Sequence, residues 1–152
     1  MYYEPDVLKR PTDMKTQEVP FNRYLGIQPS AEEGYILELA NSDKISNHLG
    51  TMHAGALFSL AEAASGAFLL QQFHNTTLEI LPVVRKADIK YSRPVESIVY
   101  ATADFTEQSV DAVYTALKER RKAVVEVKVV LYNEAHERTA ASTVHWFLAL
   151  VQ

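Results

Sequence analysis

One stretch constrains the fold more than any other. Residues 53 to 70, HAGALFSLAEAASGAFLL, are almost all apolar or small. Their length and their lack of β-branched side chains predict a helix from about His53 to Gln72 rather than a strand. Apolar residues lie on nearly every side of that helix, so it is expected to be buried. Its one acid, Glu62, lies at the middle, and a carboxylate in a buried helix needs a reason.

Composition limits the classes of protein to which the chain can belong. It has 152 residues, of which 47% are hydrophobic and 22% charged, a balance that suits one globular domain. The formal net charge of −4 disfavours a protein built mainly to bind nucleic acid. The absence of cysteine excludes disulfides, zinc–thiolate sites and a cysteine nucleophile.

We also expect a cytoplasmic protein that does not enter a membrane. Residues 1–15, MYYEPDVLKRPTDMK, lack the apolar core of a signal peptide. The most apolar stretch, residues 54–70, is too short for a comfortable membrane span and contains Glu62.

Outside the long helix, several segments repeat apolar residues every two positions, which predicts strands. Strands are predicted at residues 34–40, 87–92, 98–105, 124–132 and 139–151, and short helices at residues 12–25 and 109–121. Pro20 is expected to end or kink the first short helix, and Ser109 to cap the second. The polar residues 40–52 and 133–138 are predicted to be loops.

This order of elements predicts an α+β fold. We expect one antiparallel sheet wrapped around the long helix, in a single domain of residues 1–152 whose residues 1–25 form a helical lead-in. Such a sheet leaves an outer face or an edge uncovered, so dimerisation is expected.

Residues 47–55, which lead into the long helix, have the features of an oxyanion site. The first N–H groups of a helix have no partner within it and lie at the positive end of its dipole. Ala54 and Gly55 have minimal side chains, so a ligand oxygen can approach those N–H groups closely. Glu62 follows about two turns later on roughly the same side, and a partly desolvated Glu is expected to have a raised pKa.

Four of these residues form a recognisable pattern. Asn47, Gly50, His53 and Glu62 have spacings that resemble those of the hotdog-fold thioesterases, especially the phenylacetate-degradation (PaaI-type) branch. That pattern is an Asn, then G-x-x-H-G-G, then an Asp or Glu nine residues after the His. The sequence IKYSRPV at residues 89–95 resembles the Y-x-R-P strand end of the same family.

The resemblance extends from about residue 21 to residue 149 and implies a hotdog fold that hydrolyses acyl-CoA. It implies a homodimer or a dimer of dimers with the site at the subunit interface, and no metal or cofactor apart from the coenzyme A of the substrate. By position, the Ala54 N–H would polarise the thioester carbonyl, and Asn47 would orient the nucleophile or substrate across the interface. Glu62 would act as general base or nucleophile, and His53 would shape the turn and contact the thioester.

Further residues near these positions are expected to contact the substrate. The expected substrate-binding residues are Thr51, Gly55, Phe58, Ser59, Lys90 and Arg93. The basic residues Arg85, Lys86, Lys90 and Arg93 are candidates for the phosphates of coenzyme A. Outward-facing charges on a strand are more often simply solvated, and for this group we prefer that interpretation.

The sequence departs from the family pattern at three positions. Ala54 replaces the first of the two glycines, which a backbone donor tolerates. Glu62 replaces the commoner Asp and reaches further by one methylene. Val84 aligns where relatives often carry a hydroxyl residue that holds water, which puts the activation of water in question.

Several alternatives stay open on the sequence alone. A non-catalytic dimer that binds acyl groups or coenzyme A is favoured by Val84, and a hydratase or dehydratase of acyl thioesters is a third possibility. Such hydratases pair a catalytic His with an acid at other spacings. Glu62 could also be an exposed or ion-paired helix residue, and Asn47 an ordinary turn residue. His48 and His53 lack the third ligand that a metal site needs, so no metal is expected.

Overall fold

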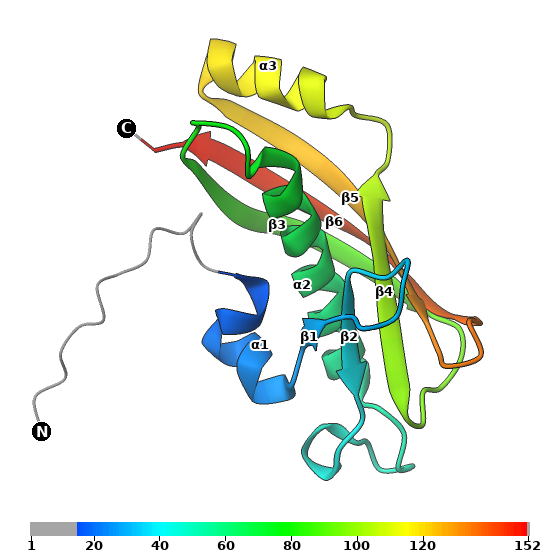
Figure 1. The fold of residues 1–152 in the computed structure, drawn as a ribbon. Helices are drawn as coiled ribbons and strands as arrows, with labels where there is room; N and C mark the ends of the chain where they lie inside the picture. The colour runs from blue at the N-terminus through cyan, green and yellow to red at the C-terminus, as the bar shows by residue number, and fades with distance from the viewer. Residues whose placement is uncertain (1–14, 152) are drawn as a thin grey trace, which may run out of the picture.

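In the computed structural model, which describes residues 15–151, a curved antiparallel sheet wraps around one long helix (Figure 1). The helix is α2, Ala54–Phe73, and the six strands run in the order β1-β2-β4-β5-β6-β3. The strands are β1 (Gln28–Pro29), β2 (Leu37–Ala40), β3 (Ile80–Tyr91), β4 (Ile98–Phe105), β5 (Lys122–Tyr132) and β6 (Arg138–Leu150). The shorter helices are η1 (Thr16–Glu18), α1 (Pro20–Leu25), η2 (Asp43–Ile45) and α3 (Val110–Arg120). The predicted α+β architecture is confirmed.

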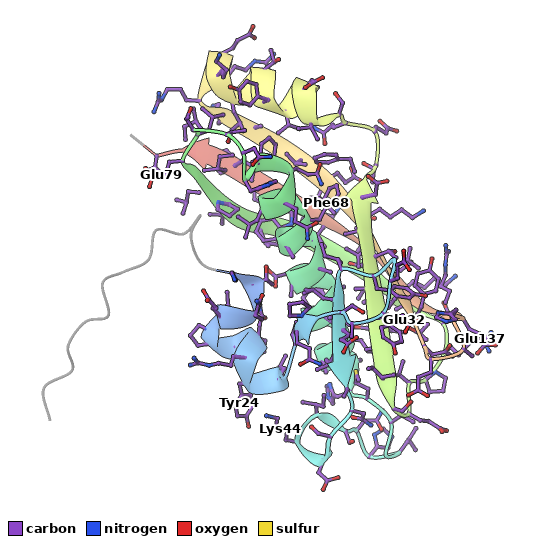
Figure 2. All side chains as sticks on the ribbon, in the orientation of Figure 1. Tyr24, Glu32, Lys44, Phe68, Glu79 and Glu137 are labelled. Atoms are coloured by element: carbon purple, nitrogen blue, oxygen red, sulfur yellow. The ribbon has the colours of Figure 1, made fainter. Side chains whose placement is uncertain are left out.

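The core lies between α2 and the inner face of the sheet. Leu60 and Ala64 of α2 are fully buried, as are Val99 of β4 and Val127 of β5. Phe68 of α2 packs edge to face against Phe105 of β4, with 4.9 Å between the ring centroids (Figure 2). Among the described helices, α2 alone has the length and apolar composition of a membrane span, a property that core helices share.

A buried polar contact fixes α2 against the sheet close to Glu62. The Ser65 hydroxyl accepts a hydrogen bond from the Trp146 indole N–H at 2.9 Å and donates one to the Glu62 carbonyl at 2.7 Å. A Cβ on Gly66 would lie 3.3 Å from the Trp146 ring, so glycine lets the helix approach β6 closely. The turn that carries Glu62 is therefore held in one position relative to the sheet.

The predicted role of Pro20 is wrong. Pro20 neither ends nor kinks a helix but begins α1, where its missing N–H would have no helical partner. The helix ends at Leu25 and is capped by Gly26, whose φ of 92° is readily accessible to glycine. Residues 12–14 of the predicted helix lie outside the described residues, so the full extent of the lead-in and of the domain stays a prediction.

The strand predictions differ in accuracy. The strand at 98–105 is confirmed as β4, whereas the segment 87–92 is only the second half of β3, which begins at Ile80. The register shifts between Val84 and Lys86, and this bulge breaks the period of two that identifies a strand. The first predicted strand begins later than expected, because Gly34 adopts a positive φ of 89° in a turn before β2.

The remaining predictions are confirmed with small shifts. Strands β5 and β6 begin one or two residues before the predicted segments. Ser109 caps α3 by accepting the Ala112 N–H at 3.1 Å. Residues 41–53, between β2 and α2, form a loop that contains the short η2 and an isolated bridge between Ser46 and Met52.

The packing of α2 supplies the first prediction. Replacing the fully buried Leu60 with alanine should lower the free energy of unfolding by about 2–5 kcal/mol, because it removes apolar contacts and leaves a cavity. The matched control is Leu49→Ala, since Leu49 is 74% exposed. Urea denaturation followed by circular dichroism measures both changes. Equal losses for the two variants would contradict a core centred on α2.

Candidate active site

In the first turn of α2, the Gly55 N–H is engaged by a side chain, whereas the Ala54 N–H is free among the described residues. His53 is the N-cap, and its Nδ1 accepts the Gly55 N–H at 2.8 Å. Since Nδ1 accepts this bond, its proton is absent and the neutral ring carries its proton on Nε2. The Ala54 N–H has no acceptor within residues 15–151. Ala54 therefore supplies the available donor that the resemblance assigns to this position.

Gly55 has a local structural reason to be glycine. A Cβ at this position would lie 3.1 Å from His53 Nδ1, tighter than an ordinary contact. Its N–H is also occupied by the cap, and its carbonyl accepts the Ser59 hydroxyl at 2.7 Å. The Gly55 N–H and the Ser59 hydroxyl are thus both bonded within the helix. The expected contacts of Gly55 and Ser59 with substrate stay predictions.

Asn47 organises the loop that precedes the helix. Its side-chain oxygen accepts the N–H groups of Leu49 at 2.9 Å and Thr51 at 3.1 Å. Its side-chain nitrogen donates to the Thr51 hydroxyl at 2.8 Å. Within one chain, Asn47 and Thr51 thus serve the loop. Their predicted contact with substrate across a subunit interface stays a prediction.

Tyr91 connects the end of β3 to the start of α2, and the sequence did not single it out as a site residue. Its hydroxyl donates to the Ala54 carbonyl at 3.0 Å. The sequence placed Tyr91 on the same strand face as Ala87 and Ile89. It could not predict the bond of Tyr91 to Ala54, because these two residues are 37 positions apart in the chain. Tyr91 thus holds the carbonyl of Ala54, the residue whose N–H is the free donor.

Glu62 combines partial burial with the absence of a compensating partner. Its carboxylate forms no hydrogen bond or ion pair with any other described residue, and burial raises the pKa of Glu62 above its ordinary value, as expected. Phe58, one turn earlier, is partly exposed and lies beside it. The Glu62 side chain is partly buried and partly exposed, and its raised pKa makes the carboxylate a stronger base than that of a surface Glu.

The free donor and the carboxylate are separated along the helix. Glu62 follows Ala54 by eight positions, which corresponds to about 12 Å along the axis and about 80° around it. Within one chain, the Ala54 N–H and the Glu62 carboxylate therefore do not meet at a single thioester carbonyl.

The expected phosphate-binding residues are exposed. Arg93 forms an ion pair with Glu137, which lies at the β5–β6 hairpin, with 3.4 Å between Arg93 Nη1 and Glu137 Oε1 (Figure 2). The Lys90 ammonium on β3 has no carboxylate partner among the described residues. Across residues 15–151, no three His, Asp or Glu side chains cluster in a way that would hold a metal ion.

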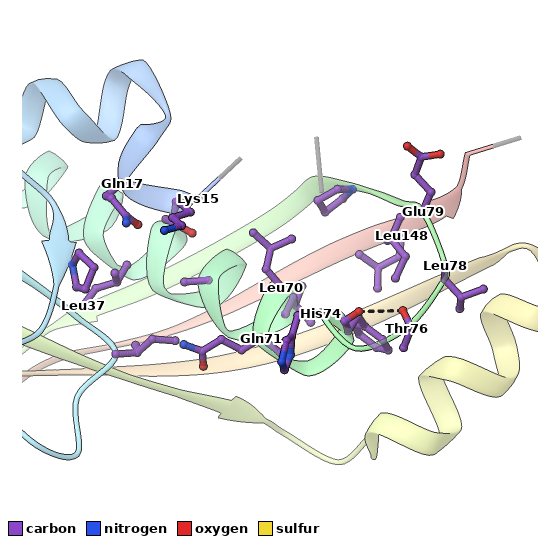
Figure 3. A pocket seen from close by; sticks show the side chains of 18 of the residues that line it. Lys15, Gln17, Leu37, Leu70, Gln71, His74, Thr76, Leu78, Glu79 and Leu148 are labelled. Carbon is purple, nitrogen blue, oxygen red and sulfur yellow. Dashed lines mark hydrogen bonds between the residues drawn. The ribbon is translucent and has the colours of Figure 1, made fainter. Parts of the chain in front are cut away.

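A cavity of about 750 Å³ lies further along α2 (Figure 3). It is bordered by the second half of α2, by Lys15 and η1, by residues near β1 and β2, and by the start of β3. None of the predicted catalytic residues lines it. The sequence held no signal for this cavity, because its walls come from segments that meet only in the folded chain.

Comparison with known families decides the relationship. The model of a family described as "Putative thioesterase (yiiD_Cterm)" matches residues 10–148. The chain belongs to this family. None of the curated proteins matches the chain.

Solved structures share this fold. A Pseudomonas aeruginosa protein of unknown function, called a probable thioesterase, is 28% identical, with a TM-score of 0.72 over 90% of this chain and 91% of that one. A thioesterase-family structure from Shewanella oneidensis is 19% identical, with a TM-score of 0.74 over 91% and 94%. A Bacillus halodurans protein solved with CoA is 19% identical, with a TM-score of 0.59 over 74% and 69%. The predicted hotdog thioesterase fold is confirmed.

The burial of Glu62 predicts a stability that depends on pH. Folding raises the pKa of Glu62 above 4.5, so just above pH 4.5 the folded chain binds more protons than the unfolded chain. The free energy of unfolding therefore falls as the pH rises above 4.5. Glu62→Gln removes this effect and should raise the Tm at about pH 8, with a smaller gain or none at about pH 4. Thermal unfolding at both pH values measures the difference.

The matched control for this prediction is Glu107→Gln, at an exposed position in the turn before α3. It should change the Tm little at either pH. A loss of stability in Glu62→Gln at about pH 8 would show that the folded state favours the ionised Glu62 carboxylate.

Proposed function

We propose that the protein hydrolyses an acyl-CoA thioester to a free acid and coenzyme A. The observation that carries the proposal is the partly buried carboxylate of Glu62, which is the one charged side chain of α2 and has no partner among residues 15–151. Such a group costs stability when ionised, and a role as base or nucleophile explains why it is present. Membership in a thioesterase family supports the reaction class.

In the proposed reaction, Glu62 takes a proton from water while the water oxygen attacks the thioester carbonyl. The negative charge that develops on the carbonyl oxygen is stabilised by the Ala54 N–H at the positive end of α2. The C–S bond then breaks, and the thiolate of coenzyme A leaves and takes up the proton. Direct attack by the carboxylate, followed by hydrolysis of the anhydride, uses the same groups.

The separation of Ala54 and Glu62 favours a site shared by two chains. Strand β3 forms one edge of the sheet, and Val83 on this strand is 48% exposed. Pairing of β3 with the β3 of a second copy would cover this edge. It would also bring the Ala54 N–H of one protomer toward the Glu62 of its partner, because Tyr91 ties the end of β3 to Ala54. We therefore propose a homodimer.

Coenzyme A is proposed as the thiol part of the substrate. One structure of the same fold was solved with CoA. Lys90 is exposed on β3 and is available to a phosphate, whereas Arg93 would first have to leave Glu137. Breaking the Arg93–Glu137 ion pair costs little free energy, because both side chains are about half exposed.

The non-catalytic acyl-binding dimer is the second candidate, and Val84 favours it. Val84 lies on β3 opposite Trp146 and offers no hydroxyl to hold a water molecule. The hydratase alternative is less well supported, because the Nδ1 of His53 is occupied by the N-cap bond. If His53 were the catalytic His, only its Nε2 would be free to exchange a proton with the substrate.

The direct test is thiol release from a panel of short, long and aromatic acyl-CoAs. Glu62→Gln should lower kcat by about 10²–10⁴-fold on every substrate that the wild type hydrolyses, because it removes the base. Glu107→Gln should leave kcat unchanged. Activity that survives in Glu62→Gln would keep the thioesterase and reject this site. Equal binding of acyl-CoA by wild type and variant, with no thiol released by either, would establish the acyl-binding protein.

The oxyanion donor can be removed without removing the helix. Ala54→Pro deletes the one free N–H at the first helical position, where proline is well tolerated, and His53 is already in the extended conformation that precedes proline. We expect kcat to fall about 10²–10³-fold with little change in Tm. Ala54→Gly, which keeps the N–H, is the matched control.

The same variant tests the shared site. When Ala54→Pro and Glu62→Gln chains are mixed and allowed to exchange, each mixed dimer should contain one doubly defective and one intact site. About a quarter of the wild-type activity should then return. No recovery, with mixed dimers shown by mass spectrometry, would place both groups of each site on one chain.

A further inference from the structure

We propose that Tyr91 is a positioning residue, whose hydroxyl fixes and strengthens a donor on His53 that faces the thioester. The Tyr91 hydroxyl donates to the Ala54 carbonyl at 3.0 Å. The N–H of that same peptide group belongs to Gly55 and donates to His53 Nδ1 at 2.8 Å. At the other end of the ring, the His53 Nε2–H has no partner among residues 15–151. We name this series of bonds the Tyr91–His53 relay. This inference rests on the proposed function.

Hydrogen bonds in series strengthen one another. When the Ala54 carbonyl accepts the Tyr91 hydroxyl, electron density moves toward the carbonyl oxygen. The N–H of the same peptide group, on Gly55, becomes a stronger donor, and its bond to His53 Nδ1 becomes stronger. A stronger bond at Nδ1 withdraws density from the ring, so the Nε2–H of His53 also becomes a stronger donor.

The relay also selects the tautomer of His53. A neutral imidazole carries its proton on one nitrogen or the other, and only the tautomer with a bare Nδ1 accepts the Gly55 N–H. Strengthening that bond lowers the population of the other tautomer, whose bare Nε2 would repel a carbonyl oxygen. The start of α2 therefore presents two donors on adjacent residues, the Ala54 N–H and the His53 Nε2–H.

The Ala54 N–H is polarised by a similar arrangement. It belongs to the same peptide group as the His53 carbonyl, which accepts the N–H groups of Ala56 at 2.9 Å and Leu57 at 3.2 Å. The His53 N–H donates to the Ile45 carbonyl at 2.8 Å, which holds this residue from the preceding loop. Both free donors thus lie on a turn whose other groups are engaged, so the turn needs little rearrangement when charge develops on the substrate.

Tyr91 is suited to remain a donor. Burial raises the pKa of Tyr91 above its ordinary value, so its hydroxyl is protonated at neutral pH. Among the described residues, the Ala54 carbonyl is the one hydrogen-bond partner of that hydroxyl. Phenylalanine at this position would keep the ring at the end of β3 and remove the donor alone.

The first test is the kinetics of Tyr91→Phe. For any acyl-CoA that the wild type hydrolyses, kcat should fall about three- to tenfold, with KM and Tm nearly unchanged, because the relay acts on the charged transition state. Tyr24→Phe is the matched control, since Tyr24 is 63% exposed on α1, and it should leave kcat unchanged. A wild-type kcat in Tyr91→Phe would overturn the inference.

A double-mutant cycle shows whether Tyr91 acts through His53. His53→Ser keeps an N-cap, because a serine hydroxyl can accept the Gly55 N–H, but it removes the ring and its Nε2–H. In the His53→Ser background, Tyr91→Phe should change kcat by less than about twofold. An equal loss of kcat in both backgrounds would show that Tyr91 does not act through His53 and would overturn the relay.

An NMR measurement separates this inference from the proposed function, because it requires no turnover. In Tyr91→Phe, the Gly55 amide proton should move upfield, since a weaker hydrogen bond leaves it more shielded. The Ala112 amide proton, which the Ser109 hydroxyl caps at the start of α3, should stay in place. An upfield shift in a protein that releases no thiol would keep the relay and reject the enzyme. An unmoved Gly55 resonance would overturn the relay in a protein with or without activity.

Discussion

The burial of α2 in the curved sheet is the interaction on which the rest of the structure depends. The helix supplies much of the core, and its composition leaves it no stable exposed face. The same packing creates the conditions for chemistry, because it places one carboxylate at the border between core and solvent. The contact of Ser65 with Trp146 holds that border in position. Fold and candidate site therefore have a common origin in a single helix.

Much of this arrangement could be predicted from local patterns. The run without β-branched residues identified α2, and uninterrupted alternation identified β4 to the residue. The predictions failed where a local signal had two meanings. Pro20 can end a helix or begin one, and only the contacts of the lead-in decide between them. The bulge beyond Val84 hid the first half of β3, because a shift of one residue reverses the faces of a strand.

The candidate site was accessible from the sequence in part. The spacing of His53 and Glu62 located both ends of the proposed chemistry, and burial of Glu62 followed from the apolar residues around it. The bond from Tyr91 to Ala54 and the cavity below Lys15 could not be predicted. Both depend on segments that are distant in the sequence, and neither leaves a periodic trace. Local patterns thus locate chemical groups, whereas the shape around them requires the fold.

The bond between Tyr91 and Ala54 has a consequence for the behaviour of the protein in solution. It joins the proposed dimer edge to the residue that carries the proposed oxyanion donor. With complementary groups on different chains, an isolated protomer holds two half-sites and no whole one. Dilution would then switch the enzyme off without unfolding it, and specific activity would rise with protein concentration until the dimer is saturated.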